Sequence, residues 1–408
     1  MPTTSSVARS ALPQLDFSEA DLWRRPGETC SAFFAAGLSA AHMPATQTVM
    51  LFRYADVLAV LTDSRFAAVG LRPLEAIGWS EGPFVEWMRH IIVVSNPPAH
   101  TRLRSLVNRA FTPRRAAALE PKLREVGNVY ADEMAEASEV DFYSSFAQRL
   151  PLTIICHMLG VPEIDHQQMQ RWTEALSIAT GIPRLEARRD ADEAVSGLID
   201  YVSGLLRERR RRPGEDLLSA LVAAEQDGDR LSSEELTAMV IQLLVAGHET
   251  TRNLIGNGLY TLLSHPEQMA RLQADPTLTR NAVEEMLRFE PSVMWISRLP
   301  REDVELAGVP VAADQLVLLN LAGANRDPSV HPDPDRFDVS RSDIRVLSFG
   351  FGEHFCLGAS LARLEGRIAF EVLLDRFSKL EFVGAPPRFA AYTALRTLES
   401  FALRVTPR

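Results

Sequence analysis

Cysteine is scarce in this chain. Only three cysteines stand among its 408 residues, Cys30, Cys156 and Cys356, and no two of them have the close spacing of a metal-binding pair. An odd number of widely separated cysteines argues against a disulfide framework and against a four-ligand zinc site. Any cysteine that carries chemistry must therefore act alone.

A net positive charge and long apolar runs are also lacking. Lys and Arg total 43 against 53 for Asp and Glu, so the net charge is -10 and no general positive field favours nucleic acid. No run of roughly 18 apolar residues could span a membrane, and residues 1–14 contain no apolar segment typical of a secretory signal. We therefore expect no nucleic-acid partner, no membrane anchor and a cytoplasmic location.

No Gly/Ser-rich or Pro-rich tract long enough to be a linker interrupts the sequence, so we predict one domain over 1–408. Most of the chain has the helical period, with short strand-like runs at 48–52, 303–306 and 315–320. The predicted fold class is therefore mainly α with small β-sheets. The last two runs, which flank a turn at Gly308, predict a small hairpin.

The strongest helical pattern begins near Ser232 and ends at about Ser264, before His265-Pro266. Ser232 and Glu235 have the spacing of a capping box. Apolar residues at i, i+3 and i+4 indicate a buried helix of roughly 48 Å. The polar cluster Gly247-His248-Glu249-Thr250-Thr251 lies at its middle, where buried polar groups are costly, so we expect it to have a function.

A glycine-rich segment surrounds the third cysteine: Phe349-Gly350-Phe351-Gly352-Glu353-His354-Phe355-Cys356-Leu357-Gly358. Glycine permits left-handed backbone and the close approach of another group. A helical pattern follows, and a helix N-terminus stabilises a thiolate, the form of cysteine that binds metals. Cys30 and Cys156 lack such surroundings and are interpreted as small buried hydrophobic side chains. Cys356 is the candidate metal ligand.

This ten-residue segment resembles the haem-binding loop of the cytochrome P450 family. Other segments resemble further motifs of that family: 97–104 its propionate-binding segment, 246–251 its oxygen-activating segment, 285–288 its glutamate–arginine motif and 331–337 its meander. The resemblance covers residues from about 45 to 408. It implies the cytochrome P450 fold, with haem b held between the long central helix and the helix that follows the cysteine loop.

The resemblance also assigns residues to the cofactor. Cys356 is expected to be the axial ligand of the haem iron, because a thiolate ligand favours O–O cleavage. The two haem propionates need hydrogen bonds or positive charge, which the resemblance assigns to His100, Arg104, Arg298 and His354. The other residues expected to contact the haem are Ala246, Gly247, Phe349, Gly350 and Gly358. Glu285 and Arg288 are expected to form a structural ion pair, with Arg336 as its third member.

Reduction of O2 consumes two protons inside an apolar pocket, so that side of the haem needs a hydroxyl and a carboxylate connected with solvent. Thr250 is the predicted hydroxyl and Glu249 the predicted proton relay, with Thr251 as the weaker candidate. A threonine inside a helix can instead donate to the carbonyl four residues back, and this alternative stays open. His248 is interpreted as a hydrogen-bonded side chain and not as a metal ligand.

The leading hypothesis is a haem-thiolate monooxygenase that inserts one atom of O2 into a lipophilic small molecule by hydroxylation or epoxidation. The alternatives are a peroxide-driven oxygenase and a non-catalytic haem-binding sensor, neither of which needs the Glu249–Thr250 pair. The resemblance implies electrons from NAD(P)H through a ferredoxin reductase and a ferredoxin, and a monomeric enzyme. The candidate contacts for that donor are Arg109, Arg114, Arg115, Lys122, Arg124, Arg363 and Arg367.

By the same resemblance, Phe84, Trp87, Met294 and Trp295 are expected to line the substrate pocket, which favours a lipophilic substrate of medium size. Aromatic and methionine side chains are also common in any protein core. These four residues therefore do not identify the substrate.

Overall fold

The computed structural model describes residues 12–16, 19–224, 231–391 and 393–408. The chain divides into two compact units, and each unit is assembled from distant parts of the sequence. The first unit comprises Met1–Val69, Gly256–Cys356 and Ala385–Phe401, and the second comprises Gly70–Ile255, Leu357–Gly384 and Ala402–Arg408. The single domain expected over 1–408 stays a prediction.

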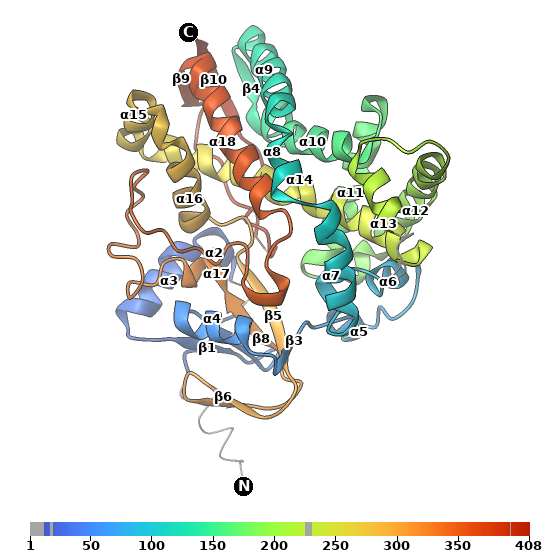
Figure 1. Ribbon diagram of the computed structural model, residues 1–408. Coiled ribbons are helices and arrows are strands. Elements are labelled where there is room, and N and C mark those ends of the chain that lie inside the picture. The colour runs from blue at the N-terminus through green and yellow to red at the C-terminus, as the bar shows by residue number, and fades with distance from the viewer. Residues whose placement is uncertain (1–11, 17–18, 225–230, 392) are drawn as a thin grey trace. The chain divides into compact units, whose positions relative to one another are not determined.

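A five-stranded mixed sheet forms the centre of the first unit, in the order β1-β2-β8-β5-β3. Strands β1 (Ala40–Met43) and β2 (Thr48–Leu51) come from the N-terminal part of the chain, and β5 (Trp295–Pro300) and β8 (Val317–Asn320) come from a much later part, blue and orange in Figure 1. β2 and β8 are parallel, whereas the other neighbouring pairs, including β3 (Phe66–Ala67) with β5, are antiparallel.

The expected hairpin forms between β6 (Val304–Leu306) and β7 (Val309–Val311). Its two turn residues, Ala307 and Gly308, both have positive φ, as a two-residue turn of type I′ requires. The run at 315–320 was wrongly assigned to this hairpin. Instead β8, whose four residues are all buried, pairs with β2 on one edge and β5 on the other in the five-stranded sheet.

Short helices make up the rest of the first unit, and some of them pack on the sheet. Val57 and Leu61 of one of them, α4, belong to the same buried cluster as Val49 of β2 and Leu319 of β8. Burial of these side chains is the main favourable term that holds the helix on the sheet. The helices of this unit are α2 (Ala20–Arg24), α3 (Pro26–Ala35), α4 (Tyr54–Thr62), α15 (Pro266–Ala274), α16 (Thr279–Phe289) and α17 (Leu321–Ala324), with the 3-10 turns η5 (Pro276–Leu278) and η6 (Gly352–His354).

The second unit is mainly helical. Its helix α18 (Ala359–Arg376, red in Figure 1) packs along α9 (Glu120–Ala137), and a small sheet of order β4-β10-β9 lies at their ends. The other helices are α5 (Arg72–Glu75), α6 (Pro83–Met88), α7 (Ala99–Ala110), α8 (Pro113–Ala117), α10 (Arg149–Leu159), α11 (His166–Gly181), α12 (Arg188–Arg211) and α13 (Leu217–Ala224). The strands are β4 (Glu139–Asp141), β9 (Phe377–Phe382) and β10 (Ala402–Pro407), and the short turns are η1 (Ile92–Val94), η2 (Tyr143–Ala147), η3 (Glu163–Asp165) and η4 (Leu185–Ala187).

The predicted long helix is α14 (Ser233–Ser264). The predicted capping box is confirmed: the Ser232 amide donates to the Glu235 carboxylate at 2.9 Å, and the Glu235 amide donates to the Ser232 hydroxyl at 3.1 Å. The helix is buried over 251–259, yet Ala246 near its middle is exposed. The polar cluster therefore lies between an accessible part of the helix at Ala246 and its buried part over 251–259.

Within the part of the chain that the structure describes, no helix has both the length and the apolar character needed to cross a membrane.

Candidate functional site

The loop before Cys356 has a fixed backbone path. The Cys356 amide donates to the Phe349 carbonyl oxygen at 2.9 Å, which closes the loop. Gly350 and Gly352 have φ of 66° and 70°, a region that favours glycine. A Cβ atom on Gly352 would also lie 2.5 Å from the Leu61 carbonyl oxygen, so no other residue fits there without movement of the backbone.

Cys356 differs from the other two cysteines in exposure. Burial raises the pKa of Cys30 to about 12 and that of Cys156 to about 12, so both remain protonated thiols at neutral pH. Cys356 is half-buried and stands three residues before α18, which begins at Ala359. The sulfur of Cys356 is therefore within reach of a metal, whereas those of Cys30 and Cys156 are buried.

Arg298 on β5 has the surroundings of an anion-binding side chain. Burial lowers the pKa of Arg298, against the attraction of Glu353. Its Nη1 atom donates to the Ser297 carbonyl oxygen at 2.8 Å, but among the described residues it makes no ion pair with a carboxylate. A largely desolvated cation of this kind is stabilised by an anion, and a carboxylate of haem fits this requirement.

The other three predicted propionate partners lie on elements that agree with that role. His100 and Arg104 stand one turn apart on α7, so their side chains share a face of the helix. His100 is buried and Arg104 is half-buried. His354 lies in η6, with its Nε2 atom 3.5 Å from the Glu353 carboxylate. The propionate roles of these residues stay predictions.

Glu249 on α14 is a buried carboxylate between two nitrogen-bearing side chains. Its Oε2 atom lies 2.6 Å from Nη2 of Arg252, and its Oε1 atom lies 3.0 Å from Nε2 of His248. Burial alone would raise the pKa of Glu249, but the hydrogen bond and charge of His248 and the charge of Arg252 hold it below its ordinary value. Arg252 also reaches Glu174 of α11 at 3.9 Å, and that carboxylate contacts solvent. Glu249 is therefore ionised. Arg252 lies between it and Glu174, whose carboxylate contacts solvent.

The two threonines after Glu249 have different surroundings. Thr250 is half-buried on the side of Ala246, and its hydroxyl donates to the Ala246 carbonyl oxygen at 3.0 Å, which is the alternative left open by the sequence. The lone pairs of that hydroxyl can still accept a hydrogen bond. Thr251 is buried beside Glu365 of α18. The structure thus favours Thr250 over Thr251 as the accessible hydroxyl, and its role toward oxygen stays a prediction.

Glu365 is a buried acid that the sequence reasoning missed. It lies on α18 with 1% of its surface exposed. Burial raises the pKa of Glu365 well above its ordinary value, and the Thr251 hydroxyl only partly opposes this shift. A signal was present: Leu361, Glu365 and Ala369 follow the i, i+4, i+8 spacing of one buried helix face.

Gly247 has a packing role of its own. A Cβ atom at this position would lie 2.9 Å from Cγ1 and 3.0 Å from Cδ1 of Ile155 on α10. The absence of a side chain therefore lets α14 and α10 approach each other. This packing explains the glycine without any cofactor. The expected contact of Gly247 with haem stays a prediction.

Replacement of Gly247 with Ala is expected to lower the free energy of unfolding by about 1–3 kcal/mol, because the added methyl group overpacks the contact with Ile155. Urea denaturation of the haem-bound protein measures this. Gly181→Ala is the control, since a Cβ there meets no atom within 4 Å. The double variant with Ile155→Ala should lose less stability than the sum of the two single changes. A neutral Gly247→Ala protein would contradict this account.

The glutamate–arginine pair is fully buried in the first unit. The Arg288 guanidinium contacts the Glu285 carboxylate at 2.7 and 2.8 Å, as predicted. The third member is Arg341, whose Nε lies 3.1 Å from Glu285, and the prediction of Arg336 was wrong. Arg336 contributes only its backbone carbonyl oxygen to Arg288, because its own side chain points to solvent and pairs with Asp338.

Arg341→Met is expected to lower the free energy of unfolding by about 2 kcal/mol, since it removes charged hydrogen bonds to Glu285 and to the Pro332 and Asp333 carbonyl oxygens. Arg336→Met, the matched control, should change it by less than about 0.5 kcal/mol. Both are measured by the midpoint of urea denaturation and by haem retention. Equal effects of the two variants would indicate that the Arg336 side chain also belongs to the buried ion network.

Two of the predicted substrate-lining residues lie in the core of the second unit. Phe84 is fully buried and stacks on Trp79 with ring centroids 4.8 Å apart. Trp87 is 4% exposed, and its indole N–H donates to the Ala238 carbonyl oxygen of α14 at 3.2 Å. Their contact with substrate stays a prediction. Six residues after Trp87, Val93 is an exposed apolar side chain.

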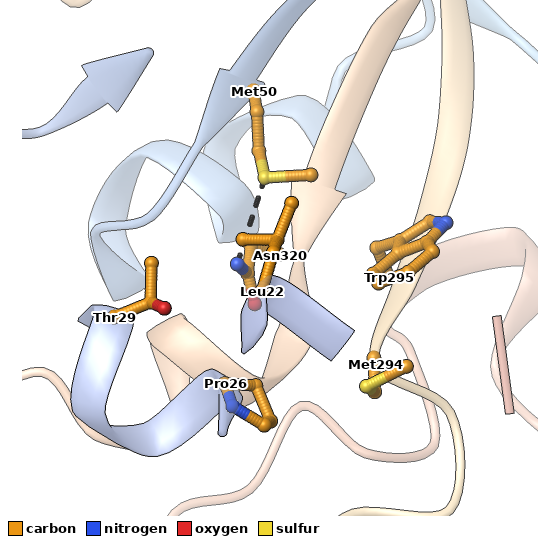
Figure 2. Close-up of a pocket in the computed structure, with 7 residues that line it drawn as sticks. All are labelled: Leu22, Pro26, Thr29, Met50, Met294, Trp295 and Asn320. Atoms are coloured by element: carbon orange, nitrogen blue, oxygen red, sulfur yellow. Dashed lines mark hydrogen bonds between the residues drawn. The ribbon is translucent and has the colours of Figure 1, made fainter. Parts of the chain in front are cut away.

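The other two, Met294 and Trp295, border a small cavity of the first unit together with Leu22 and Met50, as Figure 2 shows. The cavity has a volume of about 10 Å³, so it holds one water molecule at most and no organic substrate. Trp295 also packs edge-to-face on Trp23 at 4.7 Å. Their lining of a substrate pocket likewise stays a prediction.

The model of the family described as cytochrome P450 matches residues 40–391. The chain is 43% identical over 357 residues to the cytochrome P450 monooxygenase PikC of Streptomyces venezuelae, which covers 86% of this chain and 83% of PikC. It is 40% identical over 408 residues to the vitamin D(3) 25-hydroxylase of Pseudonocardia autotrophica, with 99% of each chain covered. The chain belongs to the cytochrome P450 family.

The solved structures agree with this assignment. CalO2 superposes with a TM-score of 0.91 at 32% identity, over 97% of this chain and 100% of CalO2. The predicted cytochrome P450 fold, mainly α with small sheets, is thereby confirmed. As a cytochrome P450 monooxygenase, the protein is an oxidoreductase whose cofactor is haem b, bound in this family through a cysteine thiolate. Cys356 is the cysteine whose exposure and loop fit that bond.

Proposed function

We propose that this cytochrome P450 hydroxylates or epoxidises a lipophilic small molecule, with one oxygen atom taken from O2. The single observation that supports this proposal is the ionised Glu249 next to the accessible Thr250 on α14, with Arg252 and Glu174 between it and solvent. An acid and an alcohol at this place serve the delivery of protons to oxygen. A peroxide-driven oxygenase or a haem sensor has no need of them.

Each part of the chain has a stated task in this proposal. When bound, the haem supplies the activation of O2, and a thiolate ligand favours O–O cleavage. Cys356 would hold the iron, and Arg298, His100, Arg104 and His354 would compensate the propionates. Thr250 would offer its hydroxyl as a hydrogen-bonding group, and Glu249 would hold a proton and pass it on beside that hydroxyl. Ala246 and Gly247, with Phe349, Gly350 and Gly358, would leave room for the macrocycle.

The proposed substrate class rests on apolar side chains that remain exposed. Val93, Ile178 and Leu185 have 56%, 67% and 50% of their surface exposed. Exposed apolar groups of this kind favour lipophilic ligands. The relative named as a vitamin D(3) 25-hydroxylase acts on a molecule of that class.

The electron donor is proposed to be a ferredoxin served by an NAD(P)H-dependent reductase, and the enzyme is proposed to act as a cytoplasmic monomer. Arg114 and Arg115 on α8 are exposed and suit an acidic partner. Arg124 and Arg367 suit it less, because Glu120 and Glu371 already neutralise them. The side chain of Arg109, another predicted contact, lies outside the described residues.

The proposed function is tested with a panel of fatty acids, terpenoids, macrolides and vitamin D(3), in which a change of haem spin state reports binding. Accepted compounds are then turned over with a ferredoxin pair under labelled O2. One labelled oxygen atom per product molecule is expected. Product that forms only with added hydrogen peroxide, or haem binding without any turnover, would support the two alternatives.

A further inference from the structure

Helix α6 begins without a cap from its own end. Its N-cap residue, Gly82, has no side chain, and Pro83 has no amide proton, so the Phe84 amide is the first N–H of the helix that needs an acceptor. That acceptor comes from another helix. Oδ1 of Asp192 on α12, 108 residues further along the chain, accepts a hydrogen bond from the Phe84 amide at 2.9 Å.

Gly82 makes room for this carboxylate. A Cβ atom at position 82 would lie 2.9 Å from Oδ2 and 3.0 Å from Oδ1 of Asp192. The φ of Gly82 is 115°, a value that residues with a side chain rarely adopt. Both the backbone and the empty space of the turn before α6 therefore fit the Asp192 side chain.

Arg188 contacts the Asp192 carboxylate from the same helix. The two residues stand one turn apart on α12, with Nε of Arg188 3.6 Å from Oδ2 of Asp192. Nη2 of Arg188 also lies 3.8 Å from the carboxylate of Glu81, directly before Gly82. The pair with Glu81 is exposed and adds little stability. Asp192 itself has 21% of its side-chain surface exposed, so its bond to α6 is largely shielded from water.

The other end of this segment is attached to α14. The indole N–H of Trp87 donates to a backbone carbonyl oxygen of α14, and the Ile92 amide donates to Oε1 of Gln242 at 2.9 Å. Gln242 stands one turn, or about 6 Å along the helix axis, before Ala246, the exposed residue of α14 that is expected to contact haem. Residues 84–92 therefore lie beside the part of α14 that carries the candidate site.

We propose that Asp192 is a positioning residue of this cytochrome P450, which fixes the start of α6 and keeps residues 84–92 in place beside the substrate pocket. Without Asp192 the Phe84 amide has no acceptor within its own helix, so the start of α6 frays. A bulky ligand then finds this wall in place for only part of the time. The inference rests on the proposed function only in that α6 borders the substrate.

The first test is hydrogen exchange of the Phe84 amide in the haem-bound protein, read by mass spectrometry at single-residue resolution. In Asp192→Ala this amide is expected to exchange about 10-fold faster, because it loses a hydrogen bond to a carboxylate. Asp192→Asn keeps an oxygen acceptor and should restore most of the protection. The Ile92 amide, bonded to Gln242, should keep its rate in both variants, which shows that the segment stays folded. An unchanged Phe84 amide in Asp192→Ala would overturn the inference.

The second test compares two haem ligands, imidazole and the bulky azole clotrimazole, by the shift of the haem absorption band. Imidazole is too small to need the wall, so its Kd should not change in Asp192→Ala. The Kd of clotrimazole should rise about 5-fold, because the wall is in place for a smaller fraction of the time. A general loss of stability would not separate the two ligands. An unchanged Kd of clotrimazole would overturn the positioning role.

Gly82→Ala and Gly78→Ala form a matched pair of further variants. Both glycines have positive φ, 115° and 79°, so both substitutions strain the backbone. The Cβ at position 82 collides with Asp192, whereas a Cβ at position 78 meets no atom of the described residues within 4 Å. Gly82→Ala is therefore expected to reproduce both effects of Asp192→Ala, and Gly78→Ala neither. Equal effects of the two glycine variants would contradict the inference.

This inference and the proposed function can fail separately, because both azoles bind without turnover. A Phe84 amide and a clotrimazole Kd that respond to Asp192→Ala in a protein that forms no product from O2 would refute the proposed oxygenase and keep the positioning role. Unchanged values in a protein that forms product would refute the positioning role and keep the oxygenase.

Discussion

Cys356→His is expected to bind haem through its imidazole and to form no product from O2. The imidazole lacks the electron donation of a thiolate, on which O–O cleavage depends. Cys356→Ser should lose most of its haem, because a hydroxyl is a weak ligand. The carbonyl spectrum of the reduced protein and the product formed with a ferredoxin pair measure both effects.

Cys156→Ser is the control for the cysteine ligand. Cys156 is buried on α10, with its pKa raised to about 12, so its replacement costs stability but leaves the thiolate spectrum intact. Normal turnover and a thiolate carbonyl spectrum in Cys356→His would refute the ligand assignment.

Thr250→Ala is expected to bind substrate and accept electrons almost as the parent does, while it diverts reducing equivalents to peroxide. The accessible hydroxyl beside Ala246 is lost, so the oxygen being reduced is no longer held for proton delivery.

Glu249→Gln should instead slow the proton-dependent step by about 10²-fold and raise the solvent isotope effect, because a carboxamide cannot cycle a proton. NAD(P)H consumed, peroxide formed and product formed measure both variants.

Thr251→Ala is the matched control for Thr250→Ala. Its hydroxyl is buried beside Glu365, so its removal should affect stability and leave the ratio of product to NAD(P)H unchanged. Coupling equal to the parent in Thr250→Ala, or a loss confined to Thr251→Ala, would contradict the assignment of the accessible hydroxyl. Either result would favour the peroxide-driven and sensor alternatives.

Local signals in the sequence predicted the parts of the structure that depend on neighbouring residues. The capping box of Ser232 and Glu235 and the turn at Ala307 and Gly308 are decided within four residues, and both are confirmed. Glu285 and Arg288 stand one helical turn apart, and their predicted ion pair is also confirmed.

Signals that depend on distant packing were missed. Arg341 replaces Arg336 beside Glu285 because the loop folds back on itself, which no spacing in the sequence reveals. The run at 315–320 joins β2 only because the chain returns to it after more than half its length. The packing role of Gly247 likewise depends on Ile155, a residue on another helix.

The parallel pairing of β2 with β8 sets an order of events during synthesis. Val49 pairs with Val317, so β2 must wait for a segment that ribosomes reach roughly 13 to 54 s later at about 5–20 residues per second. All four residues of β2 are buried in the finished sheet, so throughout that interval an apolar strand lacks a partner on one edge. Cys356 follows later still. The five-stranded sheet, and with it stable capture of haem at Cys356, can therefore be completed only after most of the protein has been made.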